Sequence, residues 1–81
     1  MSTVTDSDSV LARRSIDALL ERYVYWREEC DAVRKAYQWW GDAEGNQRAV
    51  AYAGYVAALD CEEHAARAYA RQVERVSLIY T

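Results

Sequence analysis

Apolar residues recur at alternating intervals of three and four positions through the first half of the chain. This spacing places them along one side of an α-helix, and it is typical of a helix that packs lengthwise against a partner. It predicts a helix over about residues 9–40, preceded by a flexible tail over residues 1–8. The members of this stripe are Ile16, Leu19, Tyr23, Trp26, Cys30, Val33, Tyr37 and Trp40.

A second stripe predicts a helix over about residues 46–78. Gly41 suits a helix C-cap with positive φ, and Asn46 suits the start of the next helix. The pattern therefore predicts an all-α, antiparallel two-helix hairpin with its turn over residues 41–45. The second stripe contains Tyr52, Val56, Leu59, Ala66, Ala70, Val73 and Ser77, with Tyr55, Tyr69, Val76 and Tyr80 along one flank.

A turn centred near residue 43 also predicts which residues face one another. Cys30 is expected to face Val56, and Tyr37 is expected to face Ala49. In this register large side chains of the first helix meet small side chains of the second, as close packing requires.

Composition limits the functional classes. The 81 residues make one domain at most, and the absence of Pro allows long uninterrupted helices. A net charge of −3 without a Lys/Arg stripe argues against nucleic acid as the main partner. The longest apolar run, residues 49–59, is shorter than the roughly 20 residues that span a bilayer, so we expect no membrane insertion.

The N-terminal residues lack the hydrophobic segment of a secretory signal, and the two cysteines lack metal-site or redox spacing. We therefore expect a protein that is cytoplasmic, or exported without a cleavable signal peptide. One His supports no Ser-His-Asp or Cys-His-Asn arrangement, and no glycine-rich phosphate loop exists. A non-enzymatic interaction module is the function that this predicts.

The aromatic residues exceed what two helices can bury. Tyr25 and Trp39 lie well off the first stripe, and an exposed apolar surface of that size usually marks an interface. A second hairpin, either a second copy or a related helical hairpin, is expected to complete a four-helix bundle. The predicted interface residues are Tyr25, Trp26, Trp39, Trp40, Gly41, Tyr55 and Tyr69.

Residues 39–43, Trp-Trp-Gly-Asp-Ala, fit a W-x-G-x-A pattern where the first helix meets the turn. Together with the hairpin, this pattern resembles the WxG-motif family of small type VII secretion substrates. The resemblance implies an acidic hairpin that dimerises into a four-helix bundle, with Trp39 and Gly41 as motif residues. The family's C-terminal Y-x-x-x-D/E signal is missing, because Val73 follows Tyr69 at the required position. In the alternative interpretation, Trp39 and Trp40 only close the end of the bundle.

Residues 60–64, Asp-Cys-Glu-Glu-His, concentrate potential metal ligands within one and a half helical turns. Ferritin-like bundles bind two irons through carboxylates and an i, i+3 Glu/His pair, whereas a thiolate favours zinc or copper. The alternative function is therefore a small ferritin-like protein that binds iron or zinc at a dimer interface. Its ligands would be Glu28, Glu29, Asp60, Cys61, Glu62, Glu63 and His64.

The competing interpretation of residues 60–64 is a solvated face on which Glu63 pairs with Arg67. Glu62 and Glu63 are expected at the edges of the second stripe, near Tyr23 and Arg27. A polar break of this kind in a seam fixes the register of the helices.

Overall fold

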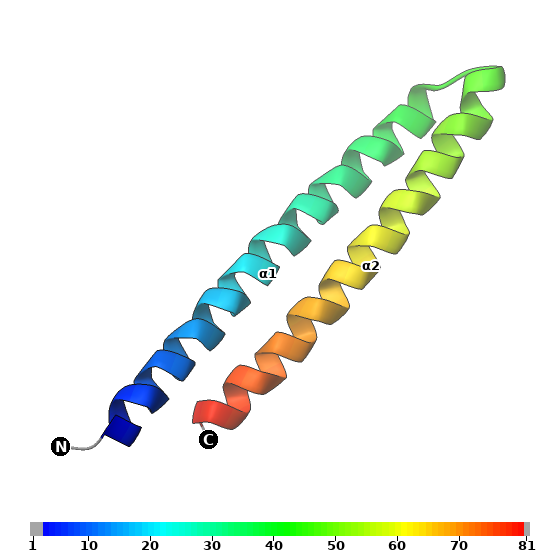
Figure 1. Cartoon of the computed structure of the whole chain (residues 1–81). Helices are drawn as coiled ribbons and strands as arrows, with labels where there is room; N and C mark the ends of the chain where they lie inside the picture. Colours follow the sequence, from blue (N-terminus) through cyan, green and yellow to red (C-terminus); the bar gives the residue numbers. More distant parts are fainter. Residues whose placement is uncertain (1–2, 81) are drawn as a thin grey trace.

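The computed structural model describes residues 3–80, with side chains described from Val10 onward. It contains two helices, α1 (Thr3–Asp42) and α2 (Asn46–Tyr80), which run antiparallel and side by side, with the N-terminal end of α1 extending past the end of α2 (Figure 1). The hairpin measures 70 × 14 × 13 Å. The prediction of an all-α, antiparallel two-helix hairpin is therefore confirmed.

The helix ends differ from the predicted ones at both ends of α1. The helix begins at Thr3, inside the predicted tail, while residues 1 and 2 lie outside the described part. At its other end α1 continues through Gly41 to Asp42, and the Ala43 N–H donates to the Trp39 carbonyl at 2.9 Å. The positive φ belongs to Gly45, at 58°, so the prediction that Gly41 caps α1 was wrong. The short turn needs one left-handed residue, and Gly45 adopts that conformation without steric cost.

The seam between the helices is a strip of buried and half-buried residues spaced by three and four. On α1 it contains Ala12, Ser15, Leu19, Trp26, Val33, Ala36 and Trp40, and on α2 it contains Ala51, Tyr55, Ala58, Glu62, Ala65, Tyr69, Gln72 and Val76. Among the described residues, Ala51 and Ala65 are the buried apolar ones, and Gln72 is the buried polar one. The Gln72 side chain donates from Nε2 to the Ser15 carbonyl at 3.0 Å.

The predicted stripe of α2 is one residue, or roughly 100°, away from the seam. Its larger members, Tyr52, Val56, Leu59 and Val73, are all exposed. Helices approach most closely where their side chains are small, and a seven-residue repeat of Ala51, Ala58 and Ala65 provides that line on α2. Large residues of α1 do meet small residues of α2, but on a different side of α2 from the predicted one.

The register across the seam is also shifted. Tyr37 contacts Tyr55 rather than Ala49, and Cys30 lies near Glu62 rather than Val56. The turn centres on residue 44, and each Cα–Cβ bond tilts toward the N-terminus of its own helix. In an antiparallel pair this tilt carries α1 side chains away from the turn and α2 side chains toward it. Both effects give each α1 residue a partner farther along α2.

Candidate interaction surface

An aromatic cluster joins the two helices near the turn. The Trp40 ring stacks on Tyr55 with centroids 5.4 Å apart and planes 17° apart. Tyr37 packs edge-on against Tyr55 at 5.5 Å, and Tyr52 lies 5.0 Å from Trp40. The Arg48 guanidinium lies 5.5 Å from the centre of the Trp40 ring. Trp40 and Tyr55, predicted at an interface between chains, thus pack against each other within one chain.

A second aromatic cluster lies near the middle of the hairpin. Trp26 stacks on Tyr69 with centroids 5.5 Å apart, and Tyr23 lies 5.6 Å from the same ring. The Trp26 indole Nε1–H donates to Glu62 Oε1 at 2.8 Å, and Cys30 Sγ lies 3.9 Å from that oxygen. Glu62 therefore lies within the seam, and Trp26 and Tyr69 are also intrachain contacts.

Trp39 packs on the other side of the seam from Tyr37. Its ring covers Gly54, where a Cβ atom would come within 2.9 Å of Trp39 Cζ3. Trp39 remains 44% exposed, and Tyr25, on the same side of α1, is 48% exposed. Gly41 faces open space. Apart from Gly41, the predicted interface residues are thus divided between the seam and the Trp39 side of the hairpin.

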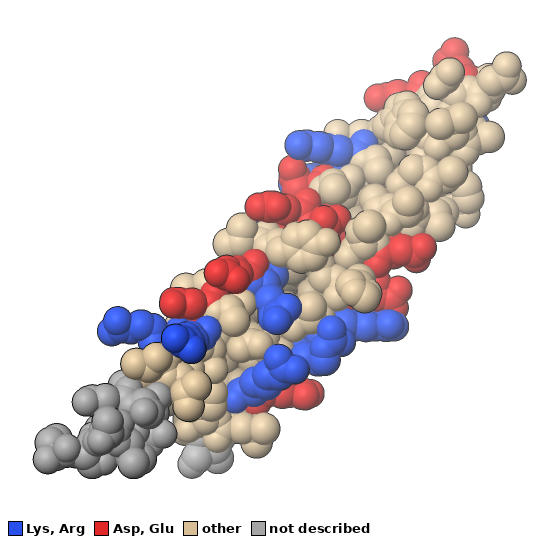
Figure 2. Space-filling view, viewed as in Figure 1, with Lys and Arg blue, Asp and Glu red and all other residues tan. Residues whose placement is uncertain are grey.

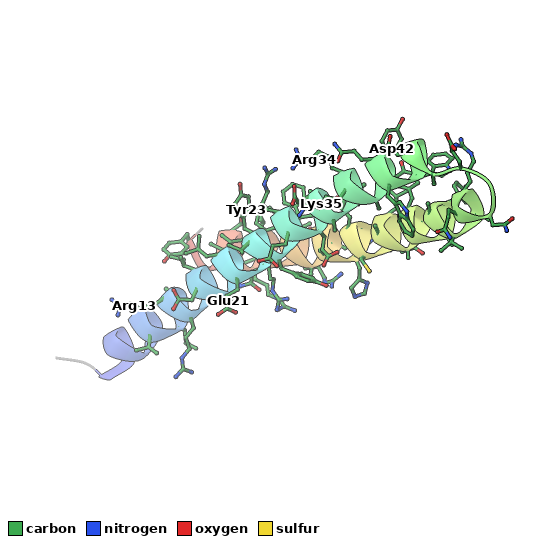
Figure 3. All side chains as sticks on the ribbon, turned by 90° about the horizontal axis from the view of Figure 1, so that it is seen from above. Arg13, Glu21, Tyr23, Arg34, Lys35 and Asp42 are labelled. Carbon is green, nitrogen blue, oxygen red and sulfur yellow. The ribbon has the colours of Figure 1, made fainter. Side chains whose placement is uncertain are left out.

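The side of the hairpin that bears Tyr37 and Tyr52 carries an uncharged surface. Both residues contact the Trp40–Tyr55 pair. Residues seven positions apart lie two turns apart on the same side of a helix, so each of the two tyrosines belongs to a line of residues along its helix. We call these lines together the open face, which consists of Ile16, Tyr23, Cys30 and Tyr37 on α1 and Tyr52, Leu59, Ala66, Val73 and Tyr80 on α2. Figure 3 shows Tyr23 and Arg34 on one side of α1 and Glu21 on the opposite side.

The sequence pattern placed this surface inside the chain. Seven of the nine open-face residues are large and exposed, with exposed fractions from 38% for Ile16 to 61% for Tyr80. None of the nine carries a charge. By contrast, Figure 2 shows a face on which charged side chains border both helices and uncharged surface gathers toward the turn.

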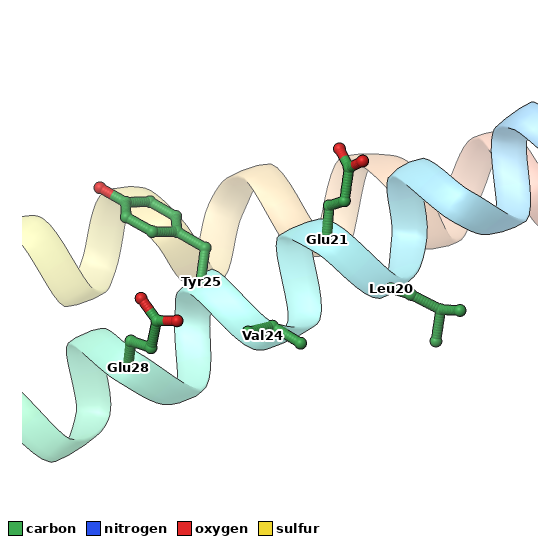
Figure 4. A pocket seen from close by; sticks show the side chains of 5 residues that line it. All are labelled: Leu20, Glu21, Val24, Tyr25 and Glu28. Carbon is green, nitrogen blue, oxygen red and sulfur yellow. The ribbon is translucent and has the colours of Figure 1, made fainter.

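The outer side of α1 has a shallow groove lined by Leu20, Glu21, Val24, Tyr25 and Glu28 (Figure 4). In the close-up, Tyr25 and Glu21 point to one side of the helix and Leu20 to the other. All five residues come from a single helix and diverge from it, so they enclose no binding site.

The candidate metal ligands do not converge within one chain. Across the described residues, no three His, Cys, Asp or Glu side chains lie close enough together to hold a metal ion. Glu28 lies on the outer groove of α1 and Glu29 is half-buried, whereas Asp60, Cys61, Glu63 and His64 are exposed on α2. Glu62 accepts from Trp26, and Glu63 pairs with Arg67 at 2.6 Å, which confirms the predicted ion pair. Cys30 and Cys61 are both free thiols.

Asp31 shows the clearest electrostatic perturbation. A hydrogen bond from the Arg34 guanidinium, followed by the Lys35 ammonium at 3.2 Å, lowers the pKa of Asp31 below its ordinary value of 3.8. All three groups lie on the surface of α1, where water screens their attraction. This cluster supports α1 locally and forms no reactive centre.

The chain matches no protein-family profile, no curated protein and no solved structure. Within residues 3–80, neither helix combines the length and hydropathy needed to cross a membrane.

Proposed function

We propose that this protein is a non-enzymatic helical interaction module whose open face packs against a second helical hairpin to form a four-helix bundle. The observation that carries the proposal is the open face itself, with seven large exposed residues and no charge along both helices. Exposed apolar surfaces of this extent mark interaction sites in soluble proteins. Two packed hairpins would bury this surface in the way that four-helix bundles do.

The accessible area of the chain supports the same proposal. The chain exposes 6306 Å², whereas a compact monomer of 9.3 kDa exposes roughly 5,000 Å². The excess of roughly 1,300 Å² exceeds the roughly 800 Å² that each partner contributes to a standard interface. The hairpin therefore has enough additional surface for a stable complex.

The resemblance to the WxG-motif family supports a more specific role as a type VII secretion substrate. Trp39 and Gly41 lie in the last turn of α1, directly before the turn of the hairpin. Export would be tested by detecting the intact chain in the medium of a host that carries this secretion system. Trp39→Ala and Gly41→Ala are expected to reduce export. Retention of the unmodified chain inside the host cells would contradict export but would leave the proposed interaction function unaffected.

Association through the open face is tested by sedimentation of the purified chain and two lysine variants. Leu59→Lys places a charge on the open face and is expected to shift the chain toward the monomer mass. Val50→Lys is the matched control, because Val50 is also an exposed apolar residue of α2 but lies one turn from Gly54, on the Trp39 side. A Leu59→Lys variant that assembles as well as the unmodified chain would contradict the proposal.

A further inference from the structure

We infer that the partner of the open face is a second copy of this chain, packed with both turns at the same end of the bundle. This inference rests on the proposed function and specifies its partner and geometry. It follows from the charges on the two edges of the open face and from the symmetry of dimers.

The positions of these charges along the hairpin axis, here called their heights, follow from the turn and from the hydrogen bonds across the seam. Trp26 and Glu62 are each 18 residues from residue 44, the centre of the turn, and they hydrogen-bond across the seam, so they lie at about the same height. Arg27 and Glu63 each follow by one position and therefore lie within about 3 Å of the same height, since each residue rises about 1.5 Å. Each is also turned by roughly 100° from the seam toward the open face. The two residues thus lie at nearly equal height on opposite edges of that face.

The two edges of the open face carry opposite charges. Along α1 the edge contains Arg13, Leu20, Arg27 and Arg34, so its charges are all positive. Along α2 the edge contains Val56, Glu63, Ala70 and Ser77, so its one charge is negative. Glu63 keeps more than half of its side chain exposed beside Arg67, and it remains accessible to a second cation.

Two symmetric dimers bring the open faces together. A two-fold axis along the hairpin places the turns at the same end and α1 against the partner's α2. This symmetry preserves height, so Arg27 meets the partner's Glu63, and the contact occurs twice.

An axis across the hairpin places the turns at opposite ends and each helix against its own copy. Because Arg27 and Glu63 lie near the middle of the paired helices, like charges then face each other. Opposed like charges disfavour the second arrangement, so the first arrangement is favoured.

The apolar residues fit the same arrangement. Tyr23 contacts Tyr69, which lies midway between Ala66 and Val73 in the sequence. Tyr37 contacts Tyr55, which lies midway between Tyr52 and Leu59. With equal heights, each α1 residue of the open face would insert between two α2 residues of the partner, as in knobs-into-holes packing.

Charge reversal tests the proposed pair. Arg27→Glu and Glu63→Arg are each expected to raise the dimer dissociation constant roughly tenfold or more at low salt, because both pairs change from attraction to repulsion. The double variant should recover the affinity of the unmodified chain, and Arg71→Glu, on the Trp39 side, should leave it unchanged. Single variants that dimerise like the unmodified chain would overturn the inference.

The distance between the two turns provides an independent test. Glu44→Cys, combined with Cys30→Ala and Cys61→Ser, allows one spin label per turn in the dimer. Pulsed electron–electron double resonance is expected to give a distance of less than roughly 30 Å between the two labels, since neighbouring helices in a bundle lie about 8–10 Å apart. A dimer with labels near the 70 Å length of the hairpin would overturn the inference and leave the proposed function intact. A chain that stays monomeric would overturn the inference. It would also contradict the proposed function in the form in which the second hairpin is another copy of this chain.

Discussion

Glu62 lies at a different place from the one that the sequence predicts, and this difference matters most for how the helices pack. The pattern places it at the edge of a stripe near Tyr23, whereas it lies in the seam and accepts the Trp26 indole N–H at 2.8 Å. Most of its neighbours in the seam are alanine or aromatic residues, which slide past one another at little cost. The directional hydrogen bond of Glu62, together with that of Gln72 to the Ser15 carbonyl, therefore fixes both the relative height and the rotation of the helices.

Substitutions at Glu62 are expected to separate hydrogen bonding from packing. Glu62→Leu leaves the half-buried Trp26 N–H without its acceptor and should lower the free energy of unfolding by about 1–2 kcal/mol. Glu62→Gln keeps a carbonyl acceptor and should cost less than about 1 kcal/mol. Urea denaturation at one fixed chain concentration measures both values. A Leu variant as stable as the Gln variant would show that the hydrogen bond does not set the seam.

Asp31 gives the pH dependence that the structure predicts. Because the Arg34 guanidinium and the Lys35 ammonium lower the pKa of Asp31, the folded state favours the carboxylate more than the unfolded chain does. The resulting stability is fully present above the ordinary pKa of 3.8 and is lost as the pH falls through the lowered folded value. Titration by NMR should place the Asp31 midpoint below 3.8, and Arg34→Ala should move it back toward 3.8. An unchanged midpoint in Arg34→Ala would assign the shift to Lys35 instead.

At the scale of the helices, the sequence predicts the elements better than it predicts their faces. The three-and-four periodicity identifies both helices, and Leu19, Trp26, Val33 and Trp40 of the α1 stripe do lie in the seam. On α2 the strongest apolar stripe is exposed instead. Hydrophobic periodicity shows that a face is buried, but it does not distinguish burial within the chain from burial against another chain.

The candidate surface was missed for the same reason. The sequence pattern assigns Tyr52, Leu59 and Val73 to the inside of the hairpin and so leaves them out of the predicted interface, whereas all three are exposed. The signal that identifies the inner line of α2 is the seven-residue repeat of Ala51, Ala58 and Ala65, because only small side chains let the helix axes approach. The bulky stripe beside it is then available for a partner.

A matched pair of alanines tests this account of the seam. Ala65 is fully buried, and Ala65→Leu should force the helices apart and lower the free energy of unfolding by about 1–3 kcal/mol. Ala57 is exposed on the same helix, and Ala57→Leu should change the same quantity by less than about 0.5 kcal/mol. Thermal or urea denaturation compares the two variants. Equal effects at both positions would contradict a seam built on the alanine repeat.

The whole molecule is a rod with little interior. It is 70 Å long and only 14 × 13 Å across, and the buried apolar residues among those described are two alanines. A two-helix rod therefore removes much less apolar surface from water than a globular domain of equal length. Half-buried aromatic stacking holds the helices together, and the open face takes part in it through the ring contacts of Tyr23, Tyr37 and Tyr52. The seven large residues of this face keep 38–61% of their surface exposed, and that part would be removed from water only on association.

The melting temperature should therefore depend on protein concentration. Each tenfold increase in chain concentration is expected to raise it by roughly 3–5 °C, since mass action favours the associated state and a bundle of this size unfolds with a large entropy. Circular dichroism at several concentrations measures this dependence. Leu59→Lys should melt at a lower temperature without any dependence on concentration, whereas Val50→Lys should follow the unmodified chain. A concentration-independent melting temperature for the unmodified chain would mean that the two helices are stable alone, and that the open face is not what holds the folded protein together.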